Sequence, residues 1–575
     1  MTLHIHLPTS ALVVLVLTLL VSTASFGDQL HKERSYWEKL LHFDGTRSRV
    51  ISEEFFVSIN GQQDALGEQK ETIRLLKSSQ GNDVACNFPA RYAWLRKQVS
   101  DLPNFDLKKC ENLQKFLHSF QKETLNIVFV SELVDAPASA FGHILLVFNN
   151  HDIPIPLAEA VHFSAQTEPD GFFRYVYSGV SGKYAGYYIR GPFFRKLNEY
   201  TVHEQRAMYI YRLDFSPEEI SRIVLHLYEL RKARFHYYFI KENCAFQISE
   251  LLAIGLPDET RTLESASFVL PIDVVKLYAD RLTERSSLSP SLLRVDNLLK
   301  KLTTDELRTV KDVIAQRSIP SDTMPDHVKE VLALHYQYSF RRHKIIYANY
   351  DQVQSLQYSP SSFKPFFIDP LENSESDRVL FGVFRSTTRT GVLFGYRPML
   401  RDIYVPQSAV NQETELALFD VQLLAYSKGF RLEQLDLLKI RSIPNHPLLW
   451  QPLSWSFYFG FNRANVRDEM RAELELGLGH NFGNRDVTFD VSVSAGLQES
   501  HGVDFYLKPN IILMGYFPAS IKLGLQISDK QFHQQHYRQH EIFLSSPLDK
   551  GFFNIRYIHA PTGNSKTMAS LNLPI

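Results

Sequence analysis

The sequence predicts an α+β protein built from a helical N-terminal part, a middle part of mixed strands and helices, and a β-rich C-terminal part. Apolar residues recur at helical spacing in "RSYWEKLLHF" and "QKETIRLLKSS". Short apolar runs that are typical of buried strands, "TLNIVFVSEL" and "HILLVF", follow. From about residue 376 apolar and polar residues alternate with period two.

A chain of 575 residues is too long for a single hydrophobic core, so we expect several domains. The expected segments are a signal peptide over 1–24, a helical region over 25–122, a strand-and-helix domain over 123–290, a helical connector over 291–350 and a β-barrel domain over 351–575.

The N-terminus carries an apolar run from Ala11 to Val21, followed by the small residues Ser22, Thr23 and Ala24. This run has the length of a signal peptide and is too short to span a bilayer comfortably, which predicts export. An uncleaved anchor is the alternative, since Lys and Arg are absent ahead of the run. We therefore expect the protein in the periplasm or outer membrane of a Gram-negative bacterium.

Composition and motifs exclude several function classes. The formal net charge is −1, so no global field recruits nucleic acid. The sequence has no zinc-ribbon spacing, phosphate loop or dinucleotide fingerprint, so we expect no cofactor and no metal.

Three cysteines are present, and export changes what they mean. Cys86 and Cys110 flank one short segment and are predicted to form a disulfide in an oxidising compartment. Cys244 is then the odd thiol, which raises the question of a function. The alternative is an inert buried cysteine.

Two helices are predicted in the middle part. "SPEEISRIVLHLYELRKA" opens with a capping box formed by Ser216 and Glu219. The second helix starts at Asn243 or Cys244, because Asn is a good N-cap, and ends at Gly255.

Cys244 therefore lies in the first turn of a helix. Unpaired N–H groups and the helix dipole at that position stabilise a thiolate, so we expect a lowered pKa. The same N–H groups can hold the oxyanion of a tetrahedral intermediate. This position is the one that a thiol acyl-transfer enzyme requires.

A thiol nucleophile needs a base and a group that orients the base. His143 is the predicted base, because it enters an apolar strand directly after Gly142, which permits close backbone approach. His162 on the next strand is the predicted third residue, and Tyr238 is a candidate oxyanion donor.

Other candidates remain open at this point. Asp135 and Glu159 are weaker candidates for the third residue. His143, His162 and Cys244 are also residue types that bind zinc, but no closely spaced ligand pair supports a zinc site.

The C-terminal part contains about twelve alternating runs, such as "WSFYFGF" and "RAELELGLG". A soluble sandwich turns the apolar face of each strand inward, whereas an outer-membrane barrel turns it toward lipid. Runs of nearly ten residues and the predicted export favour the barrel. The ending "LNLPI" lacks the terminal aromatic residue that such barrels commonly have.

"PASAFGHILLVF" and "YYFIKENCAFQISELL" resemble the Lnb N-terminal periplasmic domain, a family that includes bacterial lipoprotein N-acyltransferases. A histidine-bearing strand followed by a cysteine-bearing helix is similar to circularly permuted papain-like enzymes of the NlpC and lecithin:retinol acyltransferase type. The resemblance implies that Cys244 is the nucleophile, with Asn243 before it, and that His143 is the histidine.

The resemblance extends over most of the mature chain. "CNFPARYAWL" looks like the helical region that precedes this domain in larger relatives, and "GYRPMLRD" and "QPLSWSFYFGF" look like the β-rich domain that follows it. The sequence departs from the family pattern at Ile144, where a Thr is usual, and lacks a histidine before Asp402.

The implied activity is acyl transfer through a Cys244 thioester, from a phospholipid to an amine such as a lipoprotein N-terminus. The partners would be phospholipid, lipoprotein and membrane. One alternative is a cysteine amidase or peptidase acting on peptidoglycan. The other is a non-catalytic outer-membrane barrel with a periplasmic binding domain. Aromatic residues in "GFFRYVYSGV" and "YYIRGPFF" favour a lipid substrate.

Overall fold

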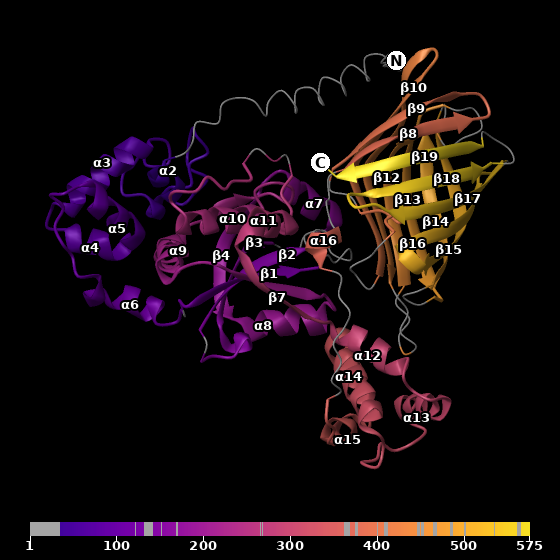
Figure 1. Ribbon diagram of the computed structural model, residues 1–575, viewed down its shortest axis with the longest axis horizontal. Coiled ribbons are helices and arrows are strands. Elements are labelled where there is room, and N and C mark those ends of the chain that lie inside the picture. Colours follow the sequence, from indigo (N-terminus) through magenta and orange to yellow (C-terminus); the bar gives the residue numbers. More distant parts are fainter. Residues whose placement is uncertain are drawn as a thin grey trace. The chain divides into compact units, whose positions relative to one another are not determined.

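The computed structural model describes two compact units, one ending at Leu288 and one beginning at Ser289 (Figure 1). The described residues are 35–120, 122–131, 142–150, 152–167, 171–264, 266, 268–360, 369–373, 378–398, 401–406, 412–444, 449, 453–463, 469–483, 487–499, 502–533, 535–560 and 565–574. The predicted signal peptide and the candidate Asp135 lie outside them. The predicted domain boundaries stay predictions.

The first unit begins with short helices, as the helical spacing predicts. They are α2 (Tyr36–Leu40), α3 (Ala65–Leu76), α4 (Gly81–Asn87), α5 (Pro89–Gln98) and α6 (Glu111–Leu117). The first of them is closed by a capping box between Ser35 and Glu38.

A buried charge network joins these helices to the rest of the unit. Arg91 lies 3.0 Å from Glu68 and 3.6 Å from Glu229, and all three side chains are fully buried. His226 Nδ1 lies 3.1 Å from Glu229, and its Nε2 lies 3.0 Å from His42 Nε2. Removing one member would leave a buried charge unpaired, so the network fixes the helical region to α9.

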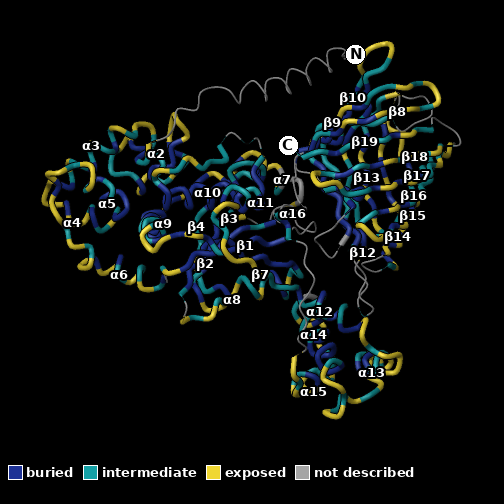
Figure 2. Tube along the Cα trace, viewed as in Figure 1, coloured by how far each residue is buried: buried dark blue, intermediate teal, exposed yellow. Residues whose placement is uncertain are grey.

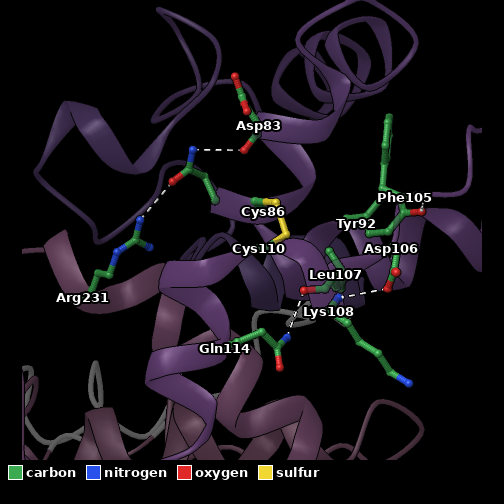
Figure 3. The surroundings of a disulfide bond; sticks show 11 residues. Asp83, Cys86, Tyr92, Phe105, Asp106, Leu107, Lys108, Cys110, Gln114 and Arg231 are labelled. Carbon is green, nitrogen blue, oxygen red and sulfur yellow. Dashed lines mark hydrogen bonds between the residues drawn. A yellow bond between two sulfur atoms is a disulfide. The ribbon is translucent and has the colours of Figure 1, made fainter.

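The disulfide between Cys86 and Cys110 is present, with 5.5 Å between the two Cα atoms, which confirms its prediction (Figure 3). It joins α4 to the residue that caps α6. Nearby, Arg231 donates to Asn87, which in turn donates to the carbonyl of Asp83. The bond therefore fixes the end of the helical region beside α9.

A seven-stranded antiparallel sheet forms the centre of the first unit, in the order β6-β4-β3-β2-β1-β5-β7. Its strands are β1 (Thr124–Val130), β2 (His143–Asn149), β3 (Glu159–Gln166), β4 (Tyr184–Pro192), β5 (Met208–Leu213), β6 (Phe235–Tyr237) and β7 (Leu282–Leu288). Every residue of β1 is buried, which explains why most of its residues are apolar.

Helices cover both faces of this sheet (Figure 1). They are α7 (Phe172–Val180), α8 (Phe193–Leu197), α9 (Pro217–Glu229), α10 (Cys244–Gly255) and α11 (Pro271–Leu277). On one face, Val128, Leu145 and Ala160 form a core with Phe193 of α8. The predicted capping box of Ser216 and Glu219 opens α9.

The second unit begins with helices α12 (Ser291–Leu299), α13 (Thr304–Ile314), α14 (Asp326–His343), α15 (Tyr350–Ser355) and α16 (Pro370–Asn373). Val295, Val310, Val331 and Tyr336 belong to their buried core. Among the described residues, none of the helices is both long and apolar enough to cross a bilayer.

Twelve described strands then close into an antiparallel barrel. They are β8 (Arg378–Ser386), β9 (Thr390–Arg397), β10 (Gln412–Tyr426), β11 (Gly429–Pro444), β12 (Leu453–Asn462), β13 (Arg471–Asn481), β14 (Val487–Glu499), β15 (Val503–Phe517), β16 (Ile521–Gln531), β17 (His536–Pro547), β18 (Phe552–His559) and β19 (Lys566–Pro574). The last strand pairs with the first, so no edge is left open.

The barrel turns its apolar side outward. On β13, Leu476 and Leu478 are 60% and 64% exposed. Glu473 and Glu475, which precede them on the same strand, are only 5% exposed. Alternating buried and exposed residues along β13 to β15 can be followed in Figure 2. This pattern is that of a barrel with an apolar exterior, which decides between the two predicted architectures against a sandwich.

We expect loss of the disulfide to destabilise the first unit by about 3 kcal/mol, because the bond closes a loop of 24 residues. The test is denaturant unfolding of Cys86→Ala/Cys110→Ala, followed by the fluorescence of Trp37 and Trp94, whose rings stack at 5.7 Å. Cys244→Ala is the matched control for loss of a sulfur. Equal midpoints for the double variant and the wild type would contradict the expectation.

Candidate functional site

Cys244 is the first residue of α10, and its side chain is 5% exposed. The helix begins there because Asn243 caps it. The Oδ1 atom of Asn243 accepts hydrogen bonds from the backbone N–H groups of Ala245, at 2.9 Å, and Phe246, at 3.3 Å. These are two of the N–H groups that a helix start leaves unpaired.

The amide nitrogen of Asn243 holds the preceding chain. Its Nδ2 atom donates to the carbonyl of Val269, at 2.7 Å, and to the carbonyl of Phe239, at 3.3 Å. Asn243 is therefore a cap and a clamp at once. It fixes the position of Cys244 against the segments on both sides.

The Tyr237 hydroxyl and the backbone N–H of Ile144 hydrogen-bond the Cys244 sulfur. The N–H of Ala245, which donates to Asn243, also stabilises the thiolate. Ile144 is the second residue of β2, so the sulfur lies against the start of the strand that carries His143. The N–H of Cys244 itself hydrogen-bonds the oxygen of Tyr237.

The pKa of Cys244 is raised to about 11, because burial disfavours the thiolate. The hydrogen bonds from Tyr237, Ile144 and Ala245, and the charge of Arg206, lower it only in part. The expectation of a lowered pKa is therefore wrong. The helix start does stabilise the thiolate, but desolvation is the larger effect at this site.

Gly142 precedes β2 with φ at +92°. A Cβ atom there would lie 2.8 Å from the carbonyl oxygen of Val130 and 3.0 Å from the ring of Phe129. Both the backbone conformation and the lack of space require glycine. This close approach lets His143 begin the strand opposite Val130.

His143 and His162 lie side by side. Their rings are 5.6 Å apart in an edge-to-face arrangement, and the ring of Tyr200 lies 5.9 Å from that of His143. Because side chains alternate along a strand, His143 shares its sheet face with Leu145 and His162 shares it with Ala160. The structure thus brings the two predicted histidines together.

Both imidazoles favour the neutral form. Burial holds the pKa of His143 well below its usual value, and the charges of His162, Arg206 and Lys196 act in the same direction. Burial, with the charge of Lys196, lowers the pKa of His162 to about 3. A neutral His143 is able to accept a proton at neutral pH, which a general base requires.

His162 is 5% exposed, and its Nδ1 atom is buried without a hydrogen-bond partner among the described residues. A buried polar atom without a partner costs free energy and requires a reason. Arg206, beside this pair, donates to the carbonyl of Ser131 at 2.6 Å and lies 5.0 Å from the ring of Tyr200.

Two predicted candidates lie elsewhere. The ring of Tyr238 packs against Gly182, in the space that a Cβ atom at that position would need. Glu159 forms an ion pair with Arg190 at 3.1 Å. Tyr237 takes the place beside the sulfur that sequence reasoning had offered to Tyr238. Tyr237 is the last residue of β6, a strand of three residues, and Tyr238 lies just beyond its end.

No group of three His, Cys, Asp or Glu residues within the described part of the chain is arranged to hold a metal ion. The structure places His143 beside His162 and places the Cys244 sulfur beside the start of β2.

A comparison with protein families identifies the part of the chain that carries this site. Residues 112–281 match the model of the Lnb N-terminal periplasmic domain, and this part of the chain is such a domain. The protein thus carries a Lnb N-terminal periplasmic domain and a C-terminal twelve-stranded barrel. The predicted family resemblance is confirmed, and a periplasmic domain supports a cell-envelope location.

Two further matches fall on either side. Residues 28–98 and 368–546 match two domains of unknown function, DUF7843 and DUF7840. No curated protein matches the chain.

Among solved structures, the chain is similar to a KdgM porin in complex with disordered oligogalacturonate, at 9% identity and a TM-score of 0.23, over 34% of this chain and 99% of the porin. It is also similar to a variant of the Rh. blastica porin, at 6% identity and a TM-score of 0.16, over 34% and 98% of the two chains. At such low scores these similarities carry no argument about function.

We expect the alkylation rate of Cys244 in the folded protein to rise about tenfold per pH unit from pH 7 to pH 10. Only the thiolate reacts, and with a pKa of about 11 its fraction grows over that whole range. Iodoacetamide labelling followed by mass spectrometry measures the rate. A plateau below pH 9 would mean that the thiolate is stabilised more than its burial allows.

We expect Asn243→Asp to destabilise the protein by about 1–3 kcal/mol, although Asp caps helices as well as Asn does. The carboxylate keeps the two bonds to Ala245 and Phe246 but faces the carbonyls of Val269 and Phe239, to which Asn donates. Urea unfolding measures the change. Ser216→Asp, a cap on α9 without such donors, is the matched control and should be nearly neutral.

Proposed function

We propose that the first unit is a cysteine-dependent acyltransferase of the cell envelope, with a permuted papain-like fold. Cys244 would carry an acyl group taken from a phospholipid and pass it to an amine such as a lipoprotein N-terminus. The observation that carries the proposal is the position of the Cys244 sulfur. It is hydrogen-bonded by Tyr237 and by the backbone N–H of Ile144, the residue that follows His143 in β2.

In the first step, neutral His143 accepts the thiol proton while the sulfur attacks the ester carbonyl of the donor. A C–S bond forms and the carbonyl oxygen becomes an oxyanion. The intermediate then collapses, and the ester C–O bond breaks. His143 returns its proton to the departing oxygen, so a lysophospholipid hydroxyl leaves and the acyl group remains on Cys244 as a thioester.

In the second step, a neutral amine attacks the thioester carbonyl. The C–S bond breaks, an amide forms, and the amine proton passes through His143 to the sulfur. The free thiol is thereby restored. If water takes the place of the amine, the same sequence of events is a hydrolysis.

The raised pKa of Cys244 and the lowered pKa of His143 favour this general-base route. A resting thiolate–imidazolium pair would require the opposite shifts. Proton transfer then accompanies attack, and the buried sulfur carries negative charge only in passing.

Stabilisation of the oxyanion falls to the donors that already surround the sulfur. The Tyr237 hydroxyl and the N–H of Ile144, which hydrogen-bond the sulfur in the resting site, are the proposed donors to the oxyanion once the substrate carbonyl is bound there. Arg206 adds a positive charge close enough to act on Cys244. His162 is the proposed positioning residue, because its ring lies edge-to-face with that of His143.

A lipid donor is favoured by the apolar surface of α7. Tyr177 and Val180 on this helix are 60% and 51% exposed. The helix packs beside the segment that leads to Cys244, since the rings of Tyr175 and Phe239 lie 5.1 Å apart. The apolar exterior of the barrel supports membrane association, which keeps an enzyme near phospholipid.

The test is intact-protein mass spectrometry after incubation with phospholipid vesicles. We expect a fatty-acyl adduct on the wild-type protein, and neutral hydroxylamine should remove it because it cleaves thioesters. Cys244→Ser should form no such thioester adduct. In His143→Ala the adduct should form at least about a hundredfold more slowly. Addition of a lipopeptide with a free N-terminal amine should discharge the adduct.

Two tyrosine variants provide the matched control. Tyr237→Phe should slow adduct formation by about tenfold or more, because it removes an oxyanion donor, whereas Tyr238→Phe should leave the rate unchanged. Absence of any adduct from phospholipid, together with cleavage of peptidoglycan fragments that depends on Cys244, would replace the proposal by a cell-wall amidase. Absence of both activities would leave a binding domain.

A further inference from the structure

The barrel contains an internal segment that the sequence pattern does not predict. Residues 401–406 follow β9, and Ile403 and Tyr404 are 2% and 6% exposed. Arg401 pairs with Leu416 of β10 through two backbone hydrogen bonds of 3.0 and 2.7 Å. Residues 401–405, called the inner segment below, thus pack on the inner side of the barrel wall.

The inner segment contacts two opposite walls of the barrel. Ile403 and Tyr404 form one apolar cluster with Ile443 of β11 and Phe543 of β17. In the closed strand order, β11 and β17 are six places apart among twelve strands, so they are opposite walls. A cluster that joins opposite walls narrows the lumen at this level.

Polar contacts hold the inner segment in place. Arg397 donates to Asp402 at 2.7 Å, and the Tyr404 hydroxyl donates to Glu541 at 2.8 Å. The guanidinium of Arg556 lies 4.3 Å from the Tyr404 ring and donates to Glu541 at 2.7 Å. Buried, charge-assisted contacts of this kind favour a fixed position of the inner segment.

The inner segment lies toward one end of the barrel. Ile443 is the penultimate residue of β11, and Phe552 of the same cluster is the first residue of β18. In antiparallel strands these positions share the rim at which β8 begins and β19 ends. We call it the first rim, and the opposite one, where β12 and β18 end, the second rim.

A cavity of about 250 Å³ lies inside the barrel, with Ile403 and Tyr404 in its lining. It extends to Arg463 and Ala560, which directly follow the ends of β12 and β18. The cavity thus has the inner segment at one end and reaches the second rim at the other.

Cations gather at the second rim. Glu433 is contacted by Arg431 and Lys566, both at 2.8 Å, and Arg463 donates to the neighbouring carbonyl of Leu432 at 2.7 Å. Arg389 is close enough for its charge to act on Arg463. The lining of the whole cavity includes eight Lys and Arg residues and five Asp and Glu residues, and this excess of positive charge attracts anions.

The cavity below is lined by groups that bind hydroxyls. Its lining includes the amides, hydroxyls and rings of Gln422, Gln434, Tyr458, Asn462, Gln526, Ser528, Tyr537 and Gln539. The volume lies just below the about 300–1,000 Å³ of drug-sized sites, which fits a ligand of monosaccharide size.

We propose that the barrel is a blind binding cup for a small sugar anion, taken up through the second rim, and is not an open pore. The carboxylate or phosphate of the ligand lies against Arg463 and Lys566, and its hydroxyls bind the amides and tyrosines below. This site is separate from the thiol site and does not depend on the function proposed for it.

The experiment is isothermal titration of the full chain in detergent micelles with glucuronate, glucose 6-phosphate and neutral glucose. We expect saturable binding of at least one anion, at least about tenfold tighter than glucose, which corresponds to one charge-assisted contact. Whether glucuronate or glucose 6-phosphate binds more tightly identifies the carboxylate or the phosphate as the preferred group.

The variant Arg463→Gln/Lys566→Gln should weaken anion binding by about tenfold or more. Lys550→Gln, on the turn between β17 and β18 at the first rim, removes a positive charge and should have no effect. Far-UV circular dichroism confirms that the barrels are intact. No saturable anion binding, binding of glucose as tight as that of the anions, or equal affinity in the double variant would overturn the proposal.

Planar-bilayer recordings test the blind end independently. We expect no steady conductance from the wild type. A steady open-channel conductance in the wild type would show that the inner segment does not close the lumen, and the cup would have to be abandoned.

Discussion

The contact between the Cys244 sulfur and the backbone N–H of Ile144 is the interaction on which the candidate site depends. It joins the start of α10 to the start of β2, two elements a hundred residues apart in the sequence. Asn243 fixes the helix end and Gly142 permits the strand to begin where it does. Each element is ordinary by itself, and the site exists only where the two ends meet.

Burial gives this site its character. It keeps Cys244 as a thiol and His143 as a neutral imidazole, and it leaves Nδ1 of His162 without a partner among the described residues. The barrel reverses the arrangement, with apolar residues outside and a charged lumen within. In the barrel the charged groups are concentrated inside, where a low dielectric strengthens their interactions.

Much of this was predictable because it depends on local patterns. Asn243 as a cap, the Cys86–Cys110 pairing and the alternation of the barrel strands follow from neighbouring residues or short spacings. The direction of the Cys244 pKa shift was not, since desolvation depends on the whole fold. Nor was the choice of Tyr237 over Tyr238, because a strand of three residues is too short to show its period. The inner segment of the barrel comes from a connection without any periodicity.

The burial of Cys244 also affects which cysteines pair when the disulfide forms. Disulfide exchange proceeds through a thiolate, and its rate falls with the accessible thiolate fraction. A cysteine that is 5% exposed with a pKa of about 11 offers almost none at neutral pH. Once α10 is packed, Cys244 is kinetically removed from the pool of exchangeable thiols, so Cys86 and Cys110 retain each other as partners and the third thiol stays reduced in an oxidising compartment.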